Sequence, residues 1–349
     1  MSSKALVAMS GGVDSSVAAA LMVDQGYECA GITLQLFKDA GACSRDIDDA
    51  KAVAAQLGIR HDVLDAAEAF DEQVIRRFIA IYGQGATPNP CIDCNRRIKF
   101  NLRLLRTLSP DFDCFATGHY ARVERDPVSG RFLLRKALDP AKDQSYVLYS
   151  LDQQQLERAR FPLGELSKQL VRKIAAEKEL INREKAESQD ICFVPDGDYG
   201  DFIESYTGTT WPPGDIVDIE GKPLGRHRGI IRYTIGQRRG LGVAANTPVY
   251  VAAKSAADNT VTLGPDSGLY SNGLTAKDIN LIACARLDTP LRVTVKTRYL
   301  QAEQPAIAEQ TGENELRITF DSPQRAITPG QAAVMYDGDI VVGGGTIAG

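Results

Sequence analysis

The chain has 349 residues, of which 44% are hydrophobic and 24% are charged, with a formal net charge of −5. This length predicts two or three domains with a sizeable buried core. The negative net charge excludes a protein that is basic over its whole surface, so a nucleic-acid partner would need a local basic patch. No apolar run approaches the ~20 residues that a membrane span needs, and residues 1–4 pass straight into a strand without room for a signal peptide. We therefore expect a cytoplasmic protein with no membrane partner.

The sequence opens with the pattern of a strand, a glycine-rich turn and a helix. An apolar run at 5–9 leads into the string S-G-G-V-D-S-S at 10–16, and helix formers follow at 17–22. Adjacent glycines expose backbone N–H groups and the helix start adds partial positive charge, so the turn is suited to phosphate. Neither G-x-G-x-x-G nor G-x-x-x-x-G-K-[ST] is present, so two common nucleotide loops are excluded. The alternative is a tight turn in which Asp14 or Ser15 caps the helix.

Strand and helix patterns then alternate along the chain. We expect strands at 28–36, 60–65 and 113–118, helices at 46–57 and 67–82, and a helical stretch at 150–180. This alternation predicts an α/β fold, with a parallel sheet covered by helices on both faces. Ligands of such sheets lie at the carboxyl ends of the strands, so Ser10, Leu34, Gly118 and His119 should surround one crevice.

From about residue 211 the pattern becomes β-rich. Short strands are expected at 249–252, 260–263, 291–297, 316–320, 332–336 and 340–343, after a Pro-Pro-Gly linker at 212–214. They predict a small antiparallel domain and then a C-terminal β-barrel. We place the domains at 1–208, 209–275 and 276–349.

Residues 221–257 contain no acidic side chain. Their basic side chains are Lys222, Arg226, Arg228, Arg232, Arg238, Arg239 and Lys254. Such a run is usually a solvated face, but it also fits the local patch that a nucleic acid would need.

The seven cysteines are an odd number in a long chain, which predicts mostly buried thiols and not a disulfide framework. In T-P-N-P-C-I-D-C-N at 87–95, two prolines fix an extended loop, and Cys94 is expected near the start of a basic helix, where its pKa would be lowered. C-x-x-C alone also fits a redox pair, half of a metal site or two structural thiols. The stretch 187–194, which contains Cys192, taken alone is typical of a buried strand with an inert cysteine.

Several strings taken together resemble one family. They are S-G-G-V-D-S-S at 10–16, T-P-N-P-x-x-x-C-N-x-x-I-K-F at 87–100, A-T-G-H-Y at 116–120, K-D-Q-S-Y at 142–146, S-Q-D-I-C-F at 188–193 and Y-T-I-G-Q-R-x-G-L-G at 233–242. The first resembles the pyrophosphate loop of the N-type ATP pyrophosphatases. In this order, over residues 5–345, they resemble the bacterial tRNA-specific 2-thiouridylases.

The resemblance implies a tRNA-uridine 2-sulfurtransferase that thiolates the wobble uridine of certain tRNAs after ATP adenylates the base and pyrophosphate leaves. It implies Cys94 as nucleophile and Cys192 as persulfide carrier, which end joined in a disulfide, and Asp14 as a residue that helps to place Mg²⁺. ATP would be bound by Ala8, Met9, Ser10, Gly11, Gly12, Val13, Asp14, Ser15, Leu34 and Gly118. The target base would face Asn89, Pro90 and Cys91. Further tRNA contacts would be His119, Lys142, Asp143, Gln144, Arg298, Tyr299 and Gln331. The expected partners are tRNA and a sulfur-carrier protein or cysteine desulfurase, with the enzyme itself a monomer.

One position departs from many members of that family, which have Asp where this chain has Cys91. Three thiolates, those of Cys91, Cys94 and Cys192, could hold a [4Fe–4S] cluster with one open iron, so a persulfide relay and a cluster both remain open. An amidotransferase-type synthetase, such as an argininosuccinate or GMP synthetase, shares the loop but gives no reason for the cysteines. An RNA-binding protein with a degenerate nucleotide fold is disfavoured by the intact loop.

Overall fold

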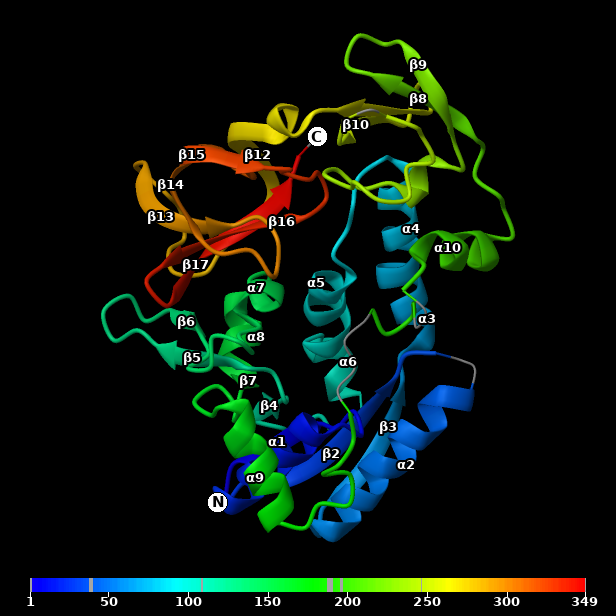
Figure 1. Cartoon of the computed structure of the whole chain (residues 1–349). Helices are drawn as coiled ribbons and strands as arrows, with labels where there is room; N and C mark the ends of the chain where they lie inside the picture. The colour runs from blue at the N-terminus through cyan, green and yellow to red at the C-terminus, as the bar shows by residue number, and fades with distance from the viewer. Residues whose placement is uncertain are drawn as a thin grey trace.

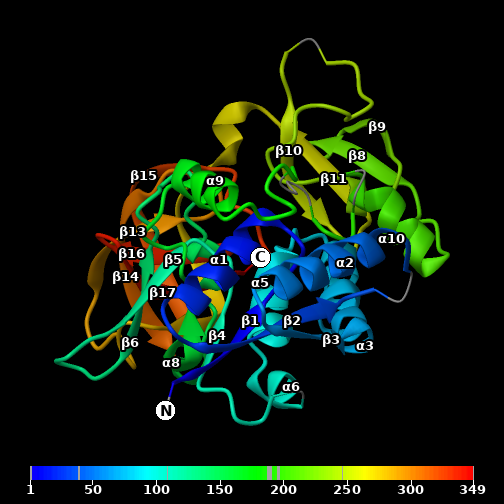
Figure 2. The same cartoon turned by 90° about the horizontal axis from the view of Figure 1, so that it is seen from below.

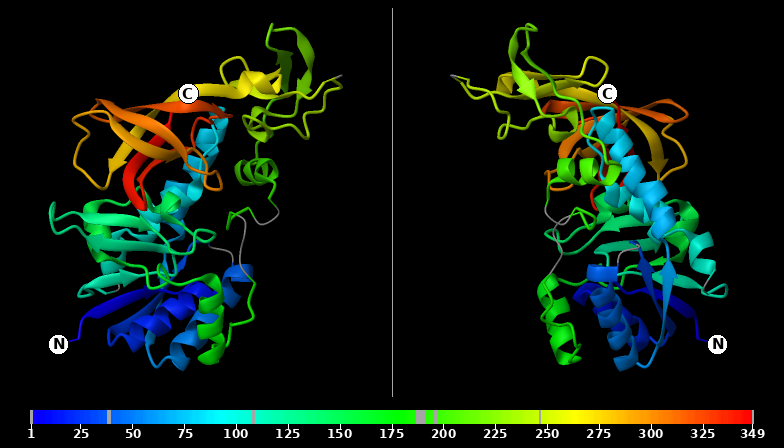
Figure 3. Two further views of the ribbon diagram at one scale, coloured as in Figure 1. Left: turned by 60° about the vertical axis from the view of Figure 1, so that its left-hand side comes forward. Right: turned by 90° about the vertical axis from the view of Figure 1, so that its right-hand side faces the viewer.

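The computed structural model describes residues 2–37, 40–107, 109–186, 191–194, 197–245 and 247–348. Among these residues, no helix is long and apolar enough to cross a membrane. An α/β domain occupies one end of the molecule, and a barrel and a smaller sheet lie side by side at the other end (Figures 1 and 3).

The α/β domain is built on a five-stranded parallel sheet of order β3-β2-β1-β4-β7. Its strands are β1 (Lys4–Ala8), β2 (Glu28–Gln35), β3 (Arg60–Asp65), β4 (Cys114–Ala116) and β7 (Ala159–Arg160). β1 lies at the centre, where Val7 is in register with Gly31 of β2 and Ala116 of β4. The predicted parallel sheet is therefore confirmed. The edge strand β7 was missed because it has two residues and lies inside the stretch expected to be helical.

Helices cover both faces of this sheet, as predicted. Successive side chains of β1 point to opposite faces of the sheet and so enter different cores. On one face, Ala5 and Val7 pack with α1 (Val13–Asp24), α2 (Ala40–Gln56) and α9 (Lys168–Glu177). Leu6 packs on the other face with residues of α6 (Leu102–Arg106), α7 (Ser145–Leu148) and α8 (Gln153–Arg158). In Figure 2, α1 and α2 lie on one side of the strands and α6 and α8 on the other.

The expected helix over 67–82 is divided by a wider turn. α3 (Ala67–Phe70) and α4 (Arg76–Gly83) are joined by the π-helical segment η1 (Asp71–Ile75). A second π-helical segment, η2 (Asn95–Lys99), directly follows α5 (Pro90–Cys94). π-Helical turns are rare in proteins, and those that occur are often at functional sites. The hydrophobic periodicity of the sequence does not distinguish them from α-helix.

The central module is a four-stranded sheet of order β10-β11-β8-β9, preceded by α10 (Tyr199–Thr207). Its strands are β8 (Gly214–Asp218), β9 (Pro223–His227), β10 (Tyr250–Ser255) and β11 (Thr260–Gly264), with the 3₁₀ turns η3 (Ile230–Arg232) and η4 (Asp266–Leu269) nearby. The expectation of a purely antiparallel sheet was wrong, because β8 and β11 pair in parallel.

The C-terminal strands form the predicted barrel. They are β12 (Tyr270–Leu281), β13 (Leu291–Lys296), β14 (Gln304–Gly312), β15 (Glu315–Arg325), β16 (Ala332–Asp337) and β17 (Ile340–Ile347), and the pairing of β12 with β17 closes them. A hairpin of the α/β domain, β5 (Ala121–Arg125) and β6 (Phe132–Lys136), joins the same eight-stranded sheet through Arg135 and Ile340. The barrel and the α/β domain consequently share one hydrophobic core.

Candidate functional site

The turn between β1 and α1 is closed by its own serines. Gly12 is the N-cap of α1 without a side-chain cap, so the alternative in which Asp14 or Ser15 caps the helix was wrong. Instead, the Ser15 hydroxyl donates to the Gly12 carbonyl oxygen (3.0 Å) and accepts the Ser10 N–H (3.1 Å). Gly11 has φ +73°, a conformation that favours glycine. The first N–H groups of α1 have no partner within the helix, so the turn can bind an anion.

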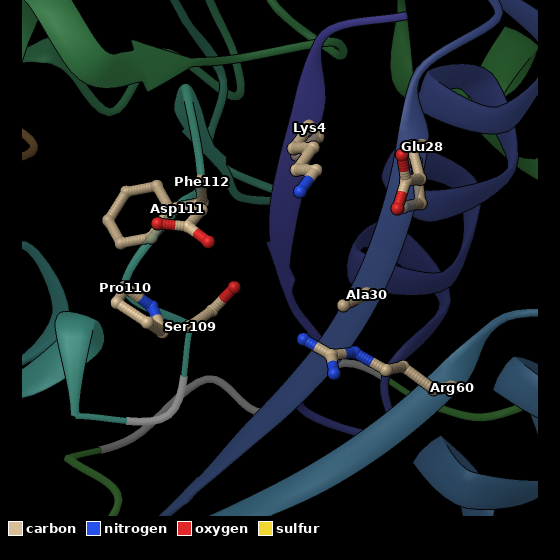
Figure 4. Close-up of a pocket in the computed structure, with 10 residues that line it drawn as sticks. Lys4, Glu28, Ala30, Arg60, Ser109, Pro110, Asp111 and Phe112 are labelled. Carbon is tan, nitrogen blue, oxygen red and sulfur yellow. The ribbon is translucent and has the colours of Figure 1, made fainter.

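Neighbouring strands bring the other predicted nucleotide residues to this turn. Gly118 follows β4, and a Cβ atom there would lie 2.8 Å from the Ser15 nitrogen, so only glycine fits against the turn. Leu34, near the end of β2, is partly buried and packs against the core that contains Cys94. The carboxyl ends of β1, β2 and β4 therefore meet at one edge, as expected. A hollow of about 370 Å³ lies at the opposite edge, near Lys4 and Arg60 (Figure 4).

Asp14 is held by two residues that sequence analysis did not find. Its Oδ1 accepts the Tyr120 hydroxyl (2.9 Å) and the Lys168 ammonium (2.7 Å). Lys168 begins α9 and its side chain is 14% exposed, against 31% for Asp14. A single part-exposed carboxylate beside a phosphate-binding turn fits Mg²⁺, which is usually held by one or two carboxylates together with phosphate oxygens.

The segment after α9 supports the turn from behind. Asn182 is buried, and its Nδ2 donates to the Gly11 carbonyl oxygen (2.8 Å) and to the Ser16 hydroxyl (2.9 Å). Lys185 binds Asp46 and Asp49 of α2. These residues lie more than a hundred positions from the turn, so no local pattern in the sequence marks them.

Cys94 lies where α5 passes directly into η2, inside a continuous helical stretch and not in its first turn. Asn89 caps α5 by accepting the Cys91 N–H (3.2 Å), and Cys94 ends the helix with 6% of its surface exposed. The expectation of a lowered pKa was wrong: burial raises the pKa of Cys94 to about 12, although the positive charge of Lys99 acts to lower it. The helix N-terminus that was expected to stabilise the thiolate is at Asn89, about one turn away.

Cys192 is brought to the same cluster by the residue that follows it. Residues 191–194 form a turn closed by the Val194 N–H and the Ile191 carbonyl (2.8 Å), not a strand, and residues 187–190 lie outside the described residues. Phe193 packs edge-on against Phe78 (centroids 5.1 Å apart) in the core that contains Cys94. Cys192 itself is exposed, and its charge contributes to raising the pKa of Cys94, as does the charge of Cys91.

The three thiols are the candidate ligands of a cluster. Cys91, Cys94 and Cys192 all lie in the described ranges, within which no three His, Cys, Asp or Glu side chains converge as metal ligands. The three thiols are nevertheless electrostatically coupled, because Cys91 contributes to raising the pKa of both Cys94 and Cys192. Among the described residues no ligand set for an iron–sulfur cluster is formed, so the cluster stays a prediction and we derive no step through one.

The residues assigned to tRNA by resemblance make many contacts inside the protein. Asp143 is buried and accepts the Ala137 N–H (3.0 Å) and the Ser145 hydroxyl (2.8 Å). Gln144 accepts the Tyr120 N–H (2.9 Å). Lys142, the residue before Asp143, is half-buried. Their roles toward tRNA stay predictions.

His119 lies behind the turn, with Nδ1 2.8 Å from the Thr117 hydroxyl and its ring against Phe100 and Phe161. Burial, together with Lys99, lowers its pKa well below the usual value. His119 is therefore a neutral hydrogen-bonding group.

The basic stretch at 221–257 is only partly a surface. Arg232 is paired with Asp201 (2.7 Å) and Glu204 (2.5 Å) of α10, and Lys254 donates to the Tyr233 carbonyl (2.6 Å). Burial lowers the pKa of Lys254 to about 8. The exposed cations of the stretch are Lys222, Arg226, Arg228, Arg238 and Arg239.

Comparison with known families agrees with this architecture. The description "tRNA methyl transferase HUP domain" matches residues 3–196, "tRNA methyl transferase PRC-barrel domain" matches 200–265, and "Aminomethyltransferase beta-barrel domain" matches 271–347. A protein of Acetivibrio thermocellus named tRNA-specific 2-thiouridylase MnmA is 48% identical over 99% of both chains. The chain belongs to the tRNA-specific 2-thiouridylase family. A 2-thiouridylase of Clostridioides difficile is 45% identical over 99% of this chain and 98% of its own.

Solved structures match this 2-thiouridylase family member more distantly. A 4-thiouridine synthetase in complex with RNA and ATP is 16% identical, with a TM-score of 0.36, and the match covers 56% of this chain and 46% of that chain. An NMN synthetase of Francisella tularensis is 15% identical, with a TM-score of 0.34, over 60% of this chain and 79% of that chain.

Proposed function

We propose that the protein is an ATP-dependent sulfurtransferase that thiolates O2 of the wobble uridine in tRNA, in the cytoplasm. The observation that carries the proposal is the combination of an anion-binding turn at 10–16 with two thiols, Cys94 in a buried core and Cys192 beside Phe193 of the same core. A synthetase that shares the turn would have no use for these thiols. Membership of the 2-thiouridylase family supports the choice of tRNA as substrate.

The first step activates the base. The O2 atom of uridine attacks the α-phosphorus of ATP, the bond to the bridging oxygen breaks, and pyrophosphate leaves into the turn at 10–16, where helix N–H groups stabilise its charge. Lys168 and Asp14 lie beside that site. Mg²⁺ bound at Asp14 would neutralise part of the phosphate charge.

The second step transfers sulfur. The terminal sulfur of a persulfide on Cys192 attacks C2 of the base, and AMP leaves. The Cys94 thiolate then attacks the Cys192 sulfur, the S–S bond breaks, and 2-thiouridine and a Cys94–Cys192 disulfide are formed. A persulfide donor, which is a sulfur-carrier protein or a cysteine desulfurase, and a thiol reductant reset the site. Cα atoms of bridged cysteines lie about 4.4–6.8 Å apart, so the two must come close in the reaction.

The test is a single-turnover thiolation of unmodified tRNA by persulfide-loaded enzyme, with pyrophosphate release followed in parallel. We expect Cys94→Ser and Cys192→Ser each to abolish thiolation while ATP binding persists, and Cys91→Asp to retain substantial activity, since Asp is common there in the family. Full activity of Cys192→Ser would refute the relay. Loss of activity in Cys91→Asp, together with loss of iron from anaerobically purified protein, would favour a cluster instead.

A further inference from the structure

Gln331, which the resemblance assigns to tRNA, binds the backbone of the sulfur site in this structure. Its Nε2 donates to the carbonyl oxygens of Thr87 (3.0 Å) and Pro88 (3.3 Å). These carbonyls belong to the two residues before Asn89, the N-cap of α5, and Cys94 is the last residue of that helix. One amide from the barrel thus fixes the point at which α5 begins.

The rest of the barrel loop is fitted to the same segment. The Thr87 N–H donates to the Pro329 carbonyl oxygen (2.8 Å). Gly330 has φ +89°, and a Cβ atom there would lie 3.0 Å from both the nitrogen and the oxygen of Thr87. The loop at 329–331 therefore binds both polar groups of the Thr87 backbone, its N–H and its carbonyl oxygen. The Thr87 hydroxyl is buried and, among the described residues, has no hydrogen-bond partner, which is unfavourable for the docked arrangement.

A second residue assigned to tRNA connects this loop to the central module. The guanidinium of Arg298 donates through Nη2 to the Ala326 carbonyl (3.0 Å), to the Thr328 hydroxyl (2.7 Å) and to the Ile235 carbonyl (3.0 Å). Ile235 precedes the exposed cation Arg238 by three positions. Hydrogen bonds thus run from the basic turn of the central module through the barrel loop to α5. In Figure 1, α5 lies between α4 and α7, beneath the barrel.

We propose that Gln331 is a positioning residue for Cys94, which holds α5 closed through the Thr87 and Pro88 carbonyls until an acceptor group of tRNA takes its amide. This proposal rests on the proposed function for the identity of that acceptor. It accounts for two findings together: a residue expected at the tRNA surface is engaged internally, and the expected nucleophile is only 6% exposed. Binding of tRNA would exchange one set of acceptors for another, and α5 would move toward the base only when the correct partner is present.

The experiment measures the accessibility of Cys94 without tRNA. N-ethylmaleimide is added to the full chain, and modification of Cys94 is read by peptide mass spectrometry against Cys91, the exposed thiol in the same helix. Gln331→Met keeps the length of the side chain and removes its donor. If each of the two lost bonds is an ordinary one, the open form becomes about 5- to 160-fold more populated, and Cys94 should react faster by that factor. Hydrogen exchange at the Thr87 amide should rise in the same variant, and in the wild-type protein when unmodified tRNA is added.

Gln304→Met is the matched control, because the Gln304 amide donates to the Ala302 carbonyl (3.3 Å) within the barrel. It should leave the Cys94 rate unchanged. A raised KM for tRNA with an unchanged Cys94 rate in Gln331→Met would overturn the proposal and leave Gln331 as a tRNA contact. Thermal melting checks the fold, and if Gln331→Met does not fold, Gln331→Glu should give the same acceleration. The alkylation result does not depend on tRNA, so failure of the thiolation assay would be distinguishable from failure of this proposal.

Discussion

Replacement of Lys168 by Met should slow pyrophosphate release without unfolding the protein. The ammonium lies 2.7 Å from Asp14 and is largely buried, at the end of α9 that faces the phosphate turn. We expect it to bind the departing pyrophosphate while Asp14 turns to Mg²⁺. A hydrogen bond to a charged group contributes about 1.5–3 kcal/mol, so the rate with saturating tRNA and ATP should fall by about 10- to 150-fold.

The assay is enzyme-coupled detection of pyrophosphate at varied ATP, with Lys173→Met as control. Lys173 lies on the same helix and forms an exposed pair with Glu177 (3.6 Å), so its loss should change neither the rate nor the melting temperature appreciably. Wild-type pyrophosphate release by Lys168→Met would show that this lysine only orders Asp14. A decrease shared equally by both variants would show that the reasoning about burial is wrong.

Three further predictions concern other parts of the site. Arg238→Glu combined with Arg239→Glu should weaken tRNA binding, as measured by filter binding, and should reduce the magnitude of the slope of log affinity against log salt by about 1.4–1.8. Unchanged affinity at low salt would show that this stretch is an ordinary solvated face. Lys99→Met should move the pH profile of Cys94 alkylation to higher pH, because burial raises the thiol pKa and the lost positive charge had lowered it; Lys99→Arg should restore the profile, and an unshifted profile would contradict the assignment. Gly118→Ala should weaken ATP binding measured by calorimetry, since its methyl group would press on the phosphate turn, and unchanged binding would show that the turn yields.

Features that depend only on residues adjacent in the chain could be predicted from the sequence. The S-G-G-V-D-S-S string predicted the turn after β1, and periodicity predicted β3 as Arg60–Asp65. Each of these is a local choice of backbone conformation, fixed by glycine placement or alternation of apolar residues.

Other features depend on contacts between distant segments. Tyr120, Lys168 and Asn182 reach the phosphate turn from 106 to 171 positions away. The burial of Cys94 depends on Phe193 and on packing of α4, none of which a local pattern contains. The pKa of Cys94 was therefore expected to fall on the basis of nearby cations, whereas the loss of water around the thiol has the larger effect.

The core shared by barrel and α/β domain limits how this protein can be divided. Tyr146 is fully buried and donates to the Ala332 carbonyl (2.9 Å) of β16, and Tyr336 of the same strand packs into that core. A fragment that ends before the barrel would expose these contacts at a cost of about 1.5–3 kcal/mol for each large side chain. Truncated forms should aggregate, and chimaeras should work only when the 121–136 hairpin and the barrel are taken from one parent.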